Sequence, residues 1–235
     1  MALLRPVLGV LGGMGPAACI DFQWKVLRAT AAPTDADNFR VVVDNDPGVP
    51  QRVAAAEGRG EPPASYLHQM AERLVAAGVT VLAMPCNAAH LSHEEASAGI
   101  DVPWLHLIRE GAAAARATGA RRIGIVGAAP TVASGMYQRE LTGLEPVVDP
   151  EGQAAVDEVI ARVKGGDLGA GTRGMARAAA DRLAVLGAQA VILGCTELPL
   201  AVADGEASIP VVDATDALAR ACVAELRRQQ SLVLR

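Results

Sequence analysis

The sequence predicts an α/β protein built from two similar domains, each with a mostly parallel sheet flanked by helices. Three observations predict this fold class. Short apolar runs alternate with longer segments of helical period, glycine and proline separate these segments, and one helix–strand unit occurs twice. Such alternation is typical of parallel sheets covered by helices on both faces. With 235 residues, 51% of them hydrophobic, the chain can bury a core of this kind.

The apolar runs of strand length predict buried strands at Val7–Leu11, Val41–Val43, Val79–Met84, Ile123–Val126 and Val191–Leu193. The segments of helical period predict helices at Ala17–Ala31, Ala64–Ala77, Ile108–Ala117, Val132–Leu141, Ala154–Val163 and Thr172–Leu186. A last helical segment, Asp213–Arg228, follows a crossing at Pro210–Val212 and is expected to return to the first half. We therefore expect one domain over residues 1–105 plus 213–235, and a second over residues 106–212.

The composition excludes several classes of partner. Aromatic residues make up only 3% of the chain, the net charge is −5, and no run of Lys or Arg occurs, so nucleic acid is not expected to bind. No segment reaches the roughly 18 apolar residues of a membrane span, and the N-terminus resembles no export signal. We expect a cytoplasmic protein whose four cysteines remain thiols and whose partner is a small molecule.

Two cysteines occupy matching positions in the repeated unit. Ala71–Gly78 is echoed by Ala180–Gly187 at an offset of 109 residues, and the same offset relates Cys86 to Cys195. Each cysteine follows a predicted strand, and ligands of parallel sheets bind beyond the carboxyl ends of the strands. Two such domains facing each other across a cleft would bring the two sulfurs to opposite sides of one bound molecule.

The position of Cys86 predicts acid–base chemistry. The helix-compatible run Ala88–Leu91 follows it, and a helix N-terminus favours a thiolate, so a modest pKa shift from about 8.5 would give a base near neutral pH. A single buried cysteine is more often a small core residue, and Cys19 and Cys222 are interpreted in that way. The matched positions favour catalysis for Cys86 and Cys195.

A metal site is the rival interpretation of Cys86, because His90 and His93 follow it closely. Structural zinc needs four ligands, and neither Cys-x2-Cys nor His-Glu-x2-His occurs. We therefore predict no metal and expect His90 to set the geometry behind Cys86 through hydrogen bonds.

The glycine turn Gly12–Pro16 ends the first strand and opens a helix, but it lacks the Gly-x-Gly-x2-Gly spacing of dinucleotide sites. No P-loop occurs either, so we predict no cofactor and expect the turn to bring backbone N–H groups close to a carboxylate. Arg52 lies on a proline-rich loop after a strand, a suitable place for a carboxylate clamp. Lys164 ends a helix, and its spacing alone is typical of a solvated residue.

Four segments, in order and at suitable spacing, carry a resemblance to a known family: Gly12–Pro16, Pro50–Arg52, Pro85–His90 and Gly194–Pro199. Together they resemble the aspartate/glutamate racemase family, which works without pyridoxal phosphate. The resemblance implies a two-domain α/β protein, commonly a homodimer, with one cysteine from each domain on either side of the substrate α-carbon. Cys86 and Cys195 fall on the two catalytic positions of that family.

The resemblance also implies substrate-binding residues. Asn87 and Thr196 would bind the carboxylate or amino group beside each cysteine, while Arg52 and Lys164 would hold the acidic side chain. The remaining members of the implied set are Thr131, in a second carboxylate-binding turn, and Met14, in the pocket wall. The chain departs from the aspartate-specific pattern at Ala88, where that pattern has threonine, so the identity of the substrate stays open.

The function expected from the sequence is cofactor-independent racemisation of an acidic amino acid, aspartate first and glutamate second. Related chemistries remain open: isomerisation of a dicarboxylate such as maleate, or racemisation of a modified amino acid. Because both cysteines are present, a single-cysteine decarboxylase is disfavoured, and Arg52 with Lys164 favours a dicarboxylate over a neutral hydantoin. A non-catalytic carboxylate-binding protein is the alternative from another class.

Overall fold

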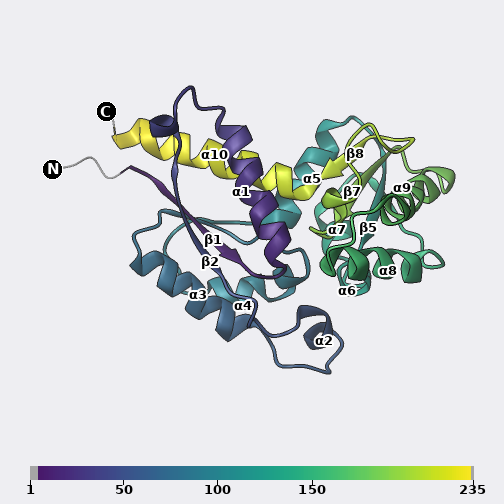
Figure 1. Ribbon diagram of the computed structural model, residues 1–235, viewed down its shortest axis with the longest axis horizontal. Helices are drawn as coiled ribbons and strands as arrows, with labels where there is room; N and C mark the ends of the chain where they lie inside the picture. The colour runs from purple at the N-terminus through teal and green to yellow at the C-terminus, as the bar shows by residue number, and fades with distance from the viewer. Residues whose placement is uncertain (1–4, 234–235) are drawn as a thin grey trace.

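The protein, seen in a computed structural model that describes residues 5–233, contains two parallel sheets flanked by helices (Figure 1). In the described residues each sheet has four strands. The first has the order β2-β1-β3-β4, with strands β1 (Val7–Gly12), β2 (Arg40–Asn45), β3 (Val81–Ala83) and β4 (Trp104–Leu105). The second has the order β6-β5-β7-β8, with strands β5 (Arg122–Gly127), β6 (Glu145–Val147), β7 (Ala190–Gly194) and β8 (Val211–Asp213).

The two sheets repeat one topology, with the second strand at one edge and the first and third strands in the centre. Every strand pair is parallel, as the alternation of apolar runs and helices predicts. The central strands β1 and β7 are buried along their whole length, which explains why their sequences are continuous apolar runs. The predicted fold class of two α/β units with parallel sheets is confirmed.

Helices connect successive strands and cover the sheets. Those of the first half are α1 (Pro16–Thr30), α2 (Arg52–Ala56), α3 (Ala64–Ala76) and α4 (His93–Ser97). Those that follow are α5 (Leu107–Ala117), α6 (Ala129–Ala133), α7 (Met136–Glu140), α8 (Gln153–Lys164), α9 (Ala170–Val185) and α10 (Ala214–Val233). Short 3-10 turns occupy Asp35–Asp37 (η1), Ala88–Ser92 (η2) and Leu198–Leu200 (η3).

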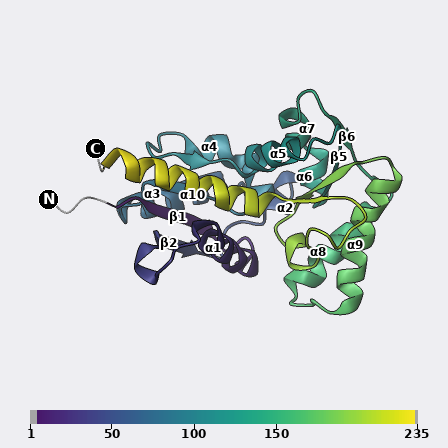
Figure 2. The same ribbon diagram turned by 90° about the horizontal axis from the view of Figure 1, so that it is seen from above.

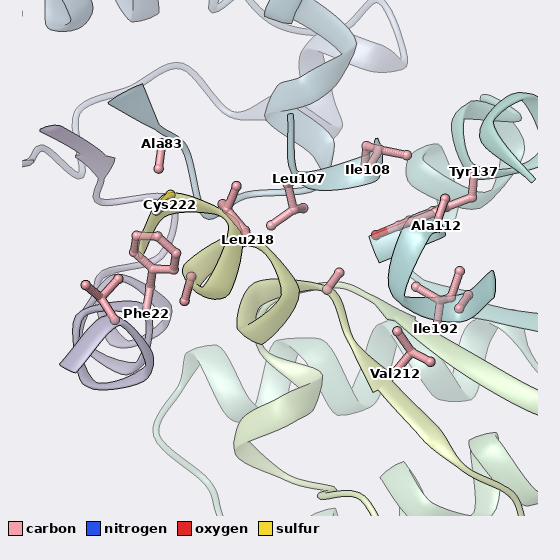
Figure 3. Close-up of a cluster of buried hydrophobic side chains, with 14 of the residues drawn as sticks. Phe22, Ala83, Leu107, Ile108, Ala112, Tyr137, Ile192, Val212, Leu218 and Cys222 are labelled. Carbon is pink, nitrogen blue, oxygen red and sulfur yellow. The ribbon is translucent and has the colours of Figure 1, made fainter. Parts of the chain in front are cut away.

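The helix α10 joins the two halves. It leaves β8 in the second half and runs beside α1 and α5 along the first half (Figures 1 and 2). One buried apolar cluster therefore extends from Phe22 on α1, through Leu107 and Leu218, to Ile192 in the second sheet (Figure 3). Cys222 lies in this cluster, as does Cys19, so both are packing residues, as their periodic apolar surroundings predict. The domain boundaries at residues 105, 106, 212 and 213 stay a prediction.

Two predicted elements are wrong in detail. The segment Val132–Leu141, predicted as one helix, is divided between α6 and α7 because Gly135 adopts a left-handed conformation with φ of 70°. Arg52, predicted on a loop, is the first residue of the short helix α2, although the prolines before it are not helical. No helix among the described residues combines the length and the apolar character that crossing a bilayer requires.

Candidate active site

The candidate site is a small cavity at the carboxyl ends of β3 and β7. Cys86 follows the end of β3 closely and Cys195 follows β7 directly, and both thiols line the cavity. Its volume of about 30 Å³ is close to the volume of one water molecule, so the walls nearly close on one another. All the predicted site residues line this one cavity: Met14, Arg52, Cys86, Asn87, Ala88, Thr131, Lys164, Cys195 and Thr196. Their roles in binding and catalysis stay a prediction.

Two glycines bring the cavity walls together. Gly13 has a φ of 90°, and a Cβ there would lie 2.1 Å from the Asp46 carbonyl oxygen, so only glycine allows the turn that places Met14 in the wall. Gly194 precedes Cys195, and a Cβ there would lie 3.2 Å from both the Val126 carbonyl oxygen and the Tyr137 ring. The glycines in these motifs therefore serve close packing around the cavity.

Cys86 is buried, and burial raises the pKa of its thiol above the ordinary value. The positive charges of Arg52 and Lys164 and a hydrogen bond from the Ala89 backbone act in the opposite direction, and burial outweighs them. The hydrogen bond from Ala89 is the predicted stabilisation of the thiolate by the following helical turn. The prediction of a lowered pKa for Cys86 is nevertheless wrong, because burial has the larger effect.

His90 supports the backbone of Cys86. Its Nδ1 lies 2.8 Å from the Cys86 carbonyl oxygen, and the Leu107 N–H donates to its Nε2 at 3.0 Å. Because a carbonyl oxygen can only accept, the ring carries its proton on Nδ1. His90 thus ties the end of β3 to the start of α5, which agrees with its predicted role behind Cys86.

Cys195 has a different electrostatic environment. Its thiol donates to the Glu197 carboxylate, with 3.0 Å between Sγ and Oε2. Burial raises the pKa of this thiol well above its ordinary value, and the negative charge and hydrogen bond of Glu197 raise it further. Lys164 is the cation that opposes this shift. The closed site thus holds Cys195 as a protonated thiol more firmly than Cys86.

Glu197 is the most important residue that the sequence analysis did not assign to the site. It is only 4% exposed and places a carboxylate beside the sulfur of Cys195. Two signals in the sequence could have indicated it, namely its position two residues after Cys195 and its place in the segment Gly194–Pro199 that carries the family resemblance. Three other lining residues were given no role: Gln51, Val53 and Ala128.

Two buried polar atoms in the lining residues have no hydrogen-bond partner within residues 5–233, namely Nδ2 of Asn87 and Oγ1 of Thr131. The other end of the Asn87 side chain, Oδ1, accepts a hydrogen bond from the Tyr137 hydroxyl at 2.6 Å. A buried donor without a partner costs free energy unless a ligand satisfies it. These two atoms are therefore available to a polar ligand such as a carboxylate.

The two cations at the cavity are placed by different elements. Arg52, the first residue of α2, is held by the segment before that helix, because its Nη1 donates to the Val49 carbonyl at 3.0 Å and the Pro50 carbonyl at 3.1 Å. Lys164 is the last residue of α8 and comes from the opposite half. Both contribute positive potential at Cys86. Together with the Glu197 carboxylate, these two cations suit an anionic ligand that also carries one positively charged group.

In the described part of the chain, no three His, Cys, Asp or Glu side chains converge as metal ligands. His90, His93 and His106 do form a cluster, with ring centroids separated by 4.6 to 5.3 Å. Their rings pack against one another behind Cys86 and do not surround a common point suited to an ion.

Comparison with known proteins identifies the family. The sequence profile described as Asp/Glu/hydantoin racemase matches residues 11–222, a region that contains both cysteines and every other residue of the cavity wall. The chain belongs to this family. The matched region covers nearly the whole of both sheets.

Individual relatives agree with this assignment. The chain is 27% identical over 231 residues to the broad specificity amino-acid racemase RacX of Bacillus subtilis, covering 96% of this chain and 100% of that protein. The structure of aspartate racemase from Picrophilus torridus is 28% identical, with a TM-score of 0.86 and 94% of each chain covered. Glutamate racemase from Thermus thermophilus shares the fold, with a TM-score of 0.66 at 21% identity over 96% of this chain and 82% of that one. The protein is thus an enzyme of the racemase family.

Proposed function

We propose that the enzyme racemises an acidic amino acid without a cofactor, with aspartate as the first candidate and glutamate as the second. The observation that carries the proposal is the cavity itself, where Cys86 from one half and Cys195 from the other lie against the same small space. Racemisation requires proton transfer on both faces of the α-carbon, and one side chain cannot reach both. Two thiols, one from each half, can meet this requirement together.

In the proposed mechanism the Cys86 thiolate removes the α-proton of one enantiomer. The Cys195 thiol delivers its own proton to the opposite face, which inverts the centre and leaves Cys195 as thiolate and Cys86 as thiol. The reverse reaction uses the same two groups with exchanged roles. Because Glu197 keeps Cys195 protonated and the cations favour the Cys86 thiolate, the resting enzyme would begin with Cys86 as the base.

The charge that develops during proton removal is delocalised onto the α-carboxylate, so the site must supply donors there. Nδ2 of Asn87 and Oγ1 of Thr131 are buried and without partners in residues 5–233, and they can donate to that carboxylate. Arg52 and Lys164 would attract the side-chain carboxylate, and Thr196 would contribute beside Cys195. Glu197 gives the substrate ammonium group a counter-charge, which favours an amino acid over maleate.

The decisive experiment follows deuterium incorporation at the α-carbon of L-aspartate and L-glutamate by NMR in deuterated buffer with no added cofactor. Exchange accompanied by inversion is expected, and both Cys86→Ala and Cys195→Ala are expected to abolish it. Cys222→Ala is the matched control, because that thiol is buried in the core away from the cavity. Normal racemisation by either cavity variant would contradict the two-base scheme.

A second candidate substrate class is an amino acid with a longer side chain. The observation in its favour is a cavity of about 100 Å³ that shares Arg52 and Ala88 with the catalytic cavity. With alanine at position 88, a hydroxyl and a methyl group are missing from the wall between the two spaces. Exchange on acids longer than glutamate, with none on aspartate or glutamate, would favour this class.

We further propose that the enzyme is a homodimer working in the reducing cytoplasm. Helix α1 exposes an apolar stripe of Ile20 (63% exposed), Trp24 (59%) and Leu27 (43%), and it lies beside the edge strand β2. A second copy covering this stripe would remove the apolar surface from water. Sedimentation equilibrium tests the proposal, since Trp24→Glu is expected to give a monomer; an unchanged mass would contradict this interface.

A further inference from the structure

Asn87 is held from the opposite half of the molecule. It follows Cys86, and its Oδ1 accepts a hydrogen bond of 2.6 Å from the hydroxyl of Tyr137 on α7. Both residues are almost completely buried, with 2% of Asn87 and 0% of Tyr137 exposed. This bond therefore joins a residue of the cavity wall to a side chain that does not itself line the cavity.

The bond decides what Asn87 offers to a ligand. A carboxamide can turn by 180°, which exchanges its acceptor oxygen for its donor nitrogen. Burial keeps the Tyr137 hydroxyl protonated by raising its pKa, and the hydroxyl donates to Oδ1. With the amide turned, Nδ2 would donate to the hydroxyl oxygen instead, and the hydroxyl proton would lose the acceptor that it has here. Nδ2 has no partner within residues 5–233. In this orientation Asn87 presents a donor to the substrate, and in the turned orientation it would present lone pairs.

We propose that Tyr137 is a positioning residue, which fixes the Asn87 carboxamide so that Nδ2 donates to the carboxylate of the substrate. The inference rests on the proposed function for the identity of that substrate. A carboxylate accepts hydrogen bonds from N–H groups and is repelled by a carbonyl oxygen, so the orientation of the amide decides whether Asn87 binds or opposes it.

The ring of Tyr137 is itself fixed by two glycines. A Cβ at Gly194 would lie 3.2 Å from Cε2 of Tyr137, and a Cβ at Gly111 on α5 would lie 3.3 Å from Cε1 and from the hydroxyl oxygen. The ring thus fills the space that these glycines leave, within the same buried cluster as Ala112 and Ile192 (Figure 3). Gly194 precedes Cys195, and Asn87 follows Cys86. The Tyr137 side chain therefore contacts the backbone next to Cys195 and donates a hydrogen bond to the residue next to Cys86.

The test is a double-mutant cycle with Tyr137→Phe, Asn87→Ala and the combined variant. Tyr137→Phe keeps the ring and removes only the hydroxyl, so Asn87 is no longer held with Nδ2 towards the substrate carboxylate. Loss of that hydrogen bond to a charged group is expected to lower kcat/KM for the racemised amino acid about 10- to 100-fold. In the Asn87→Ala background the same change is expected to lower kcat/KM by less than about threefold, because the group that Tyr137 positions is gone. Independent effects that multiply would overturn the proposal, as would a Tyr137→Phe enzyme within threefold of the wild type.

Tyr66→Phe is the matched control, because Tyr66 is the other tyrosine and its hydroxyl donates to Asp46 outside the cavity. It is expected to leave kcat/KM within threefold. Affinity for succinate, measured by calorimetry, separates this inference from the proposed function. If the wild type binds succinate but racemises nothing, the proposed function fails, and a 10-fold or greater loss of succinate affinity in Tyr137→Phe would still support the positioning role. Equal affinity in the two proteins, or no binding to the wild type, would overturn it.

Discussion

Replacing Glu197 by glutamine tests whether the neighbouring carboxylate sets the acidity of Cys195. The Sγ–Oε2 distance is 3.0 Å, and both side chains are buried. Two unit charges about 4 Å apart interact with about 4 kcal/mol at an effective dielectric constant of 20, and one pKa unit corresponds to about 1.4 kcal/mol. The carboxylate charge is shared by two oxygens and the surroundings relax, so this interaction energy is an upper limit, and we expect Glu197→Gln to lower the pKa of Cys195.

The assay is the pH dependence of alkylation by iodoacetamide, with each modified cysteine quantified by peptide mass spectrometry. The thiolate is the reacting species, so the midpoint of labelling at Cys195 reports its pKa. Cys86 in the same samples provides a comparison, and its labelling midpoint is expected to shift less than that of Cys195. Glu197 also raises the pKa of Cys86, but burial, the charge of Arg52 and the Ala89 hydrogen bond affect that pKa more. An unchanged Cys195 midpoint in a folded variant would refute the assigned role of Glu197.

Two further predictions concern specificity and acid stability. Ala88→Thr restores the hydroxyl of the aspartate-specific pattern, so it is expected to raise kcat/KM for aspartate relative to longer substrates; an unchanged ratio on a panel of acids would remove Ala88 as the determinant. Burial lowers the pKa of His106 to about 4, and the pKa values of His90 and His93 also lie below their ordinary values. The unfolded chain therefore takes up more protons below about pH 6.5, and stability present above that pH is lost as the pH falls towards 4. After a discount for its partial exposure, His106 is expected to account for about 1 to 2 kcal/mol between pH 7 and pH 5 in urea unfolding, and His106→Gln is expected to flatten this dependence.

The sequence predicts the central strands and long helices because their apolar period is a local property. The elements it misses are short or irregular. β4 has only two residues, too few to form a recognisable apolar run. β6 contains Pro146, which an edge strand tolerates but which interrupts the apolar run by which a strand is recognised in the sequence. The division of the segment Val132–Leu141 depends on Gly135, whose left-handed conformation the helical period of its neighbours conceals.

For the site, placement is more predictable than acidity. The matched positions of Cys86 and Cys195 after strands were enough to predict one shared site, and both line one cavity. Spacing alone would not have selected Lys164, because its approach to the cavity depends on how α8 packs. The thiol pKa values also escaped prediction, since burial outweighs the favourable helical turns and only the folded structure reveals how buried each sulfur is.

The repeated scaffold and the unlike surroundings of the two thiols have separate consequences. Equal topology in the two sheets places Cys86 and Cys195 at corresponding strand ends, which is the arrangement that the proposed two-base mechanism requires. Burial raises the pKa of both thiols, so the thiol that loses its proton more readily is the better candidate for the base. The cations near Cys86 and the carboxylate of Glu197 at Cys195 make the two thiols differ in this respect. In the proposed mechanism this difference in charge favours Cys86 as the base and Cys195 as the acid.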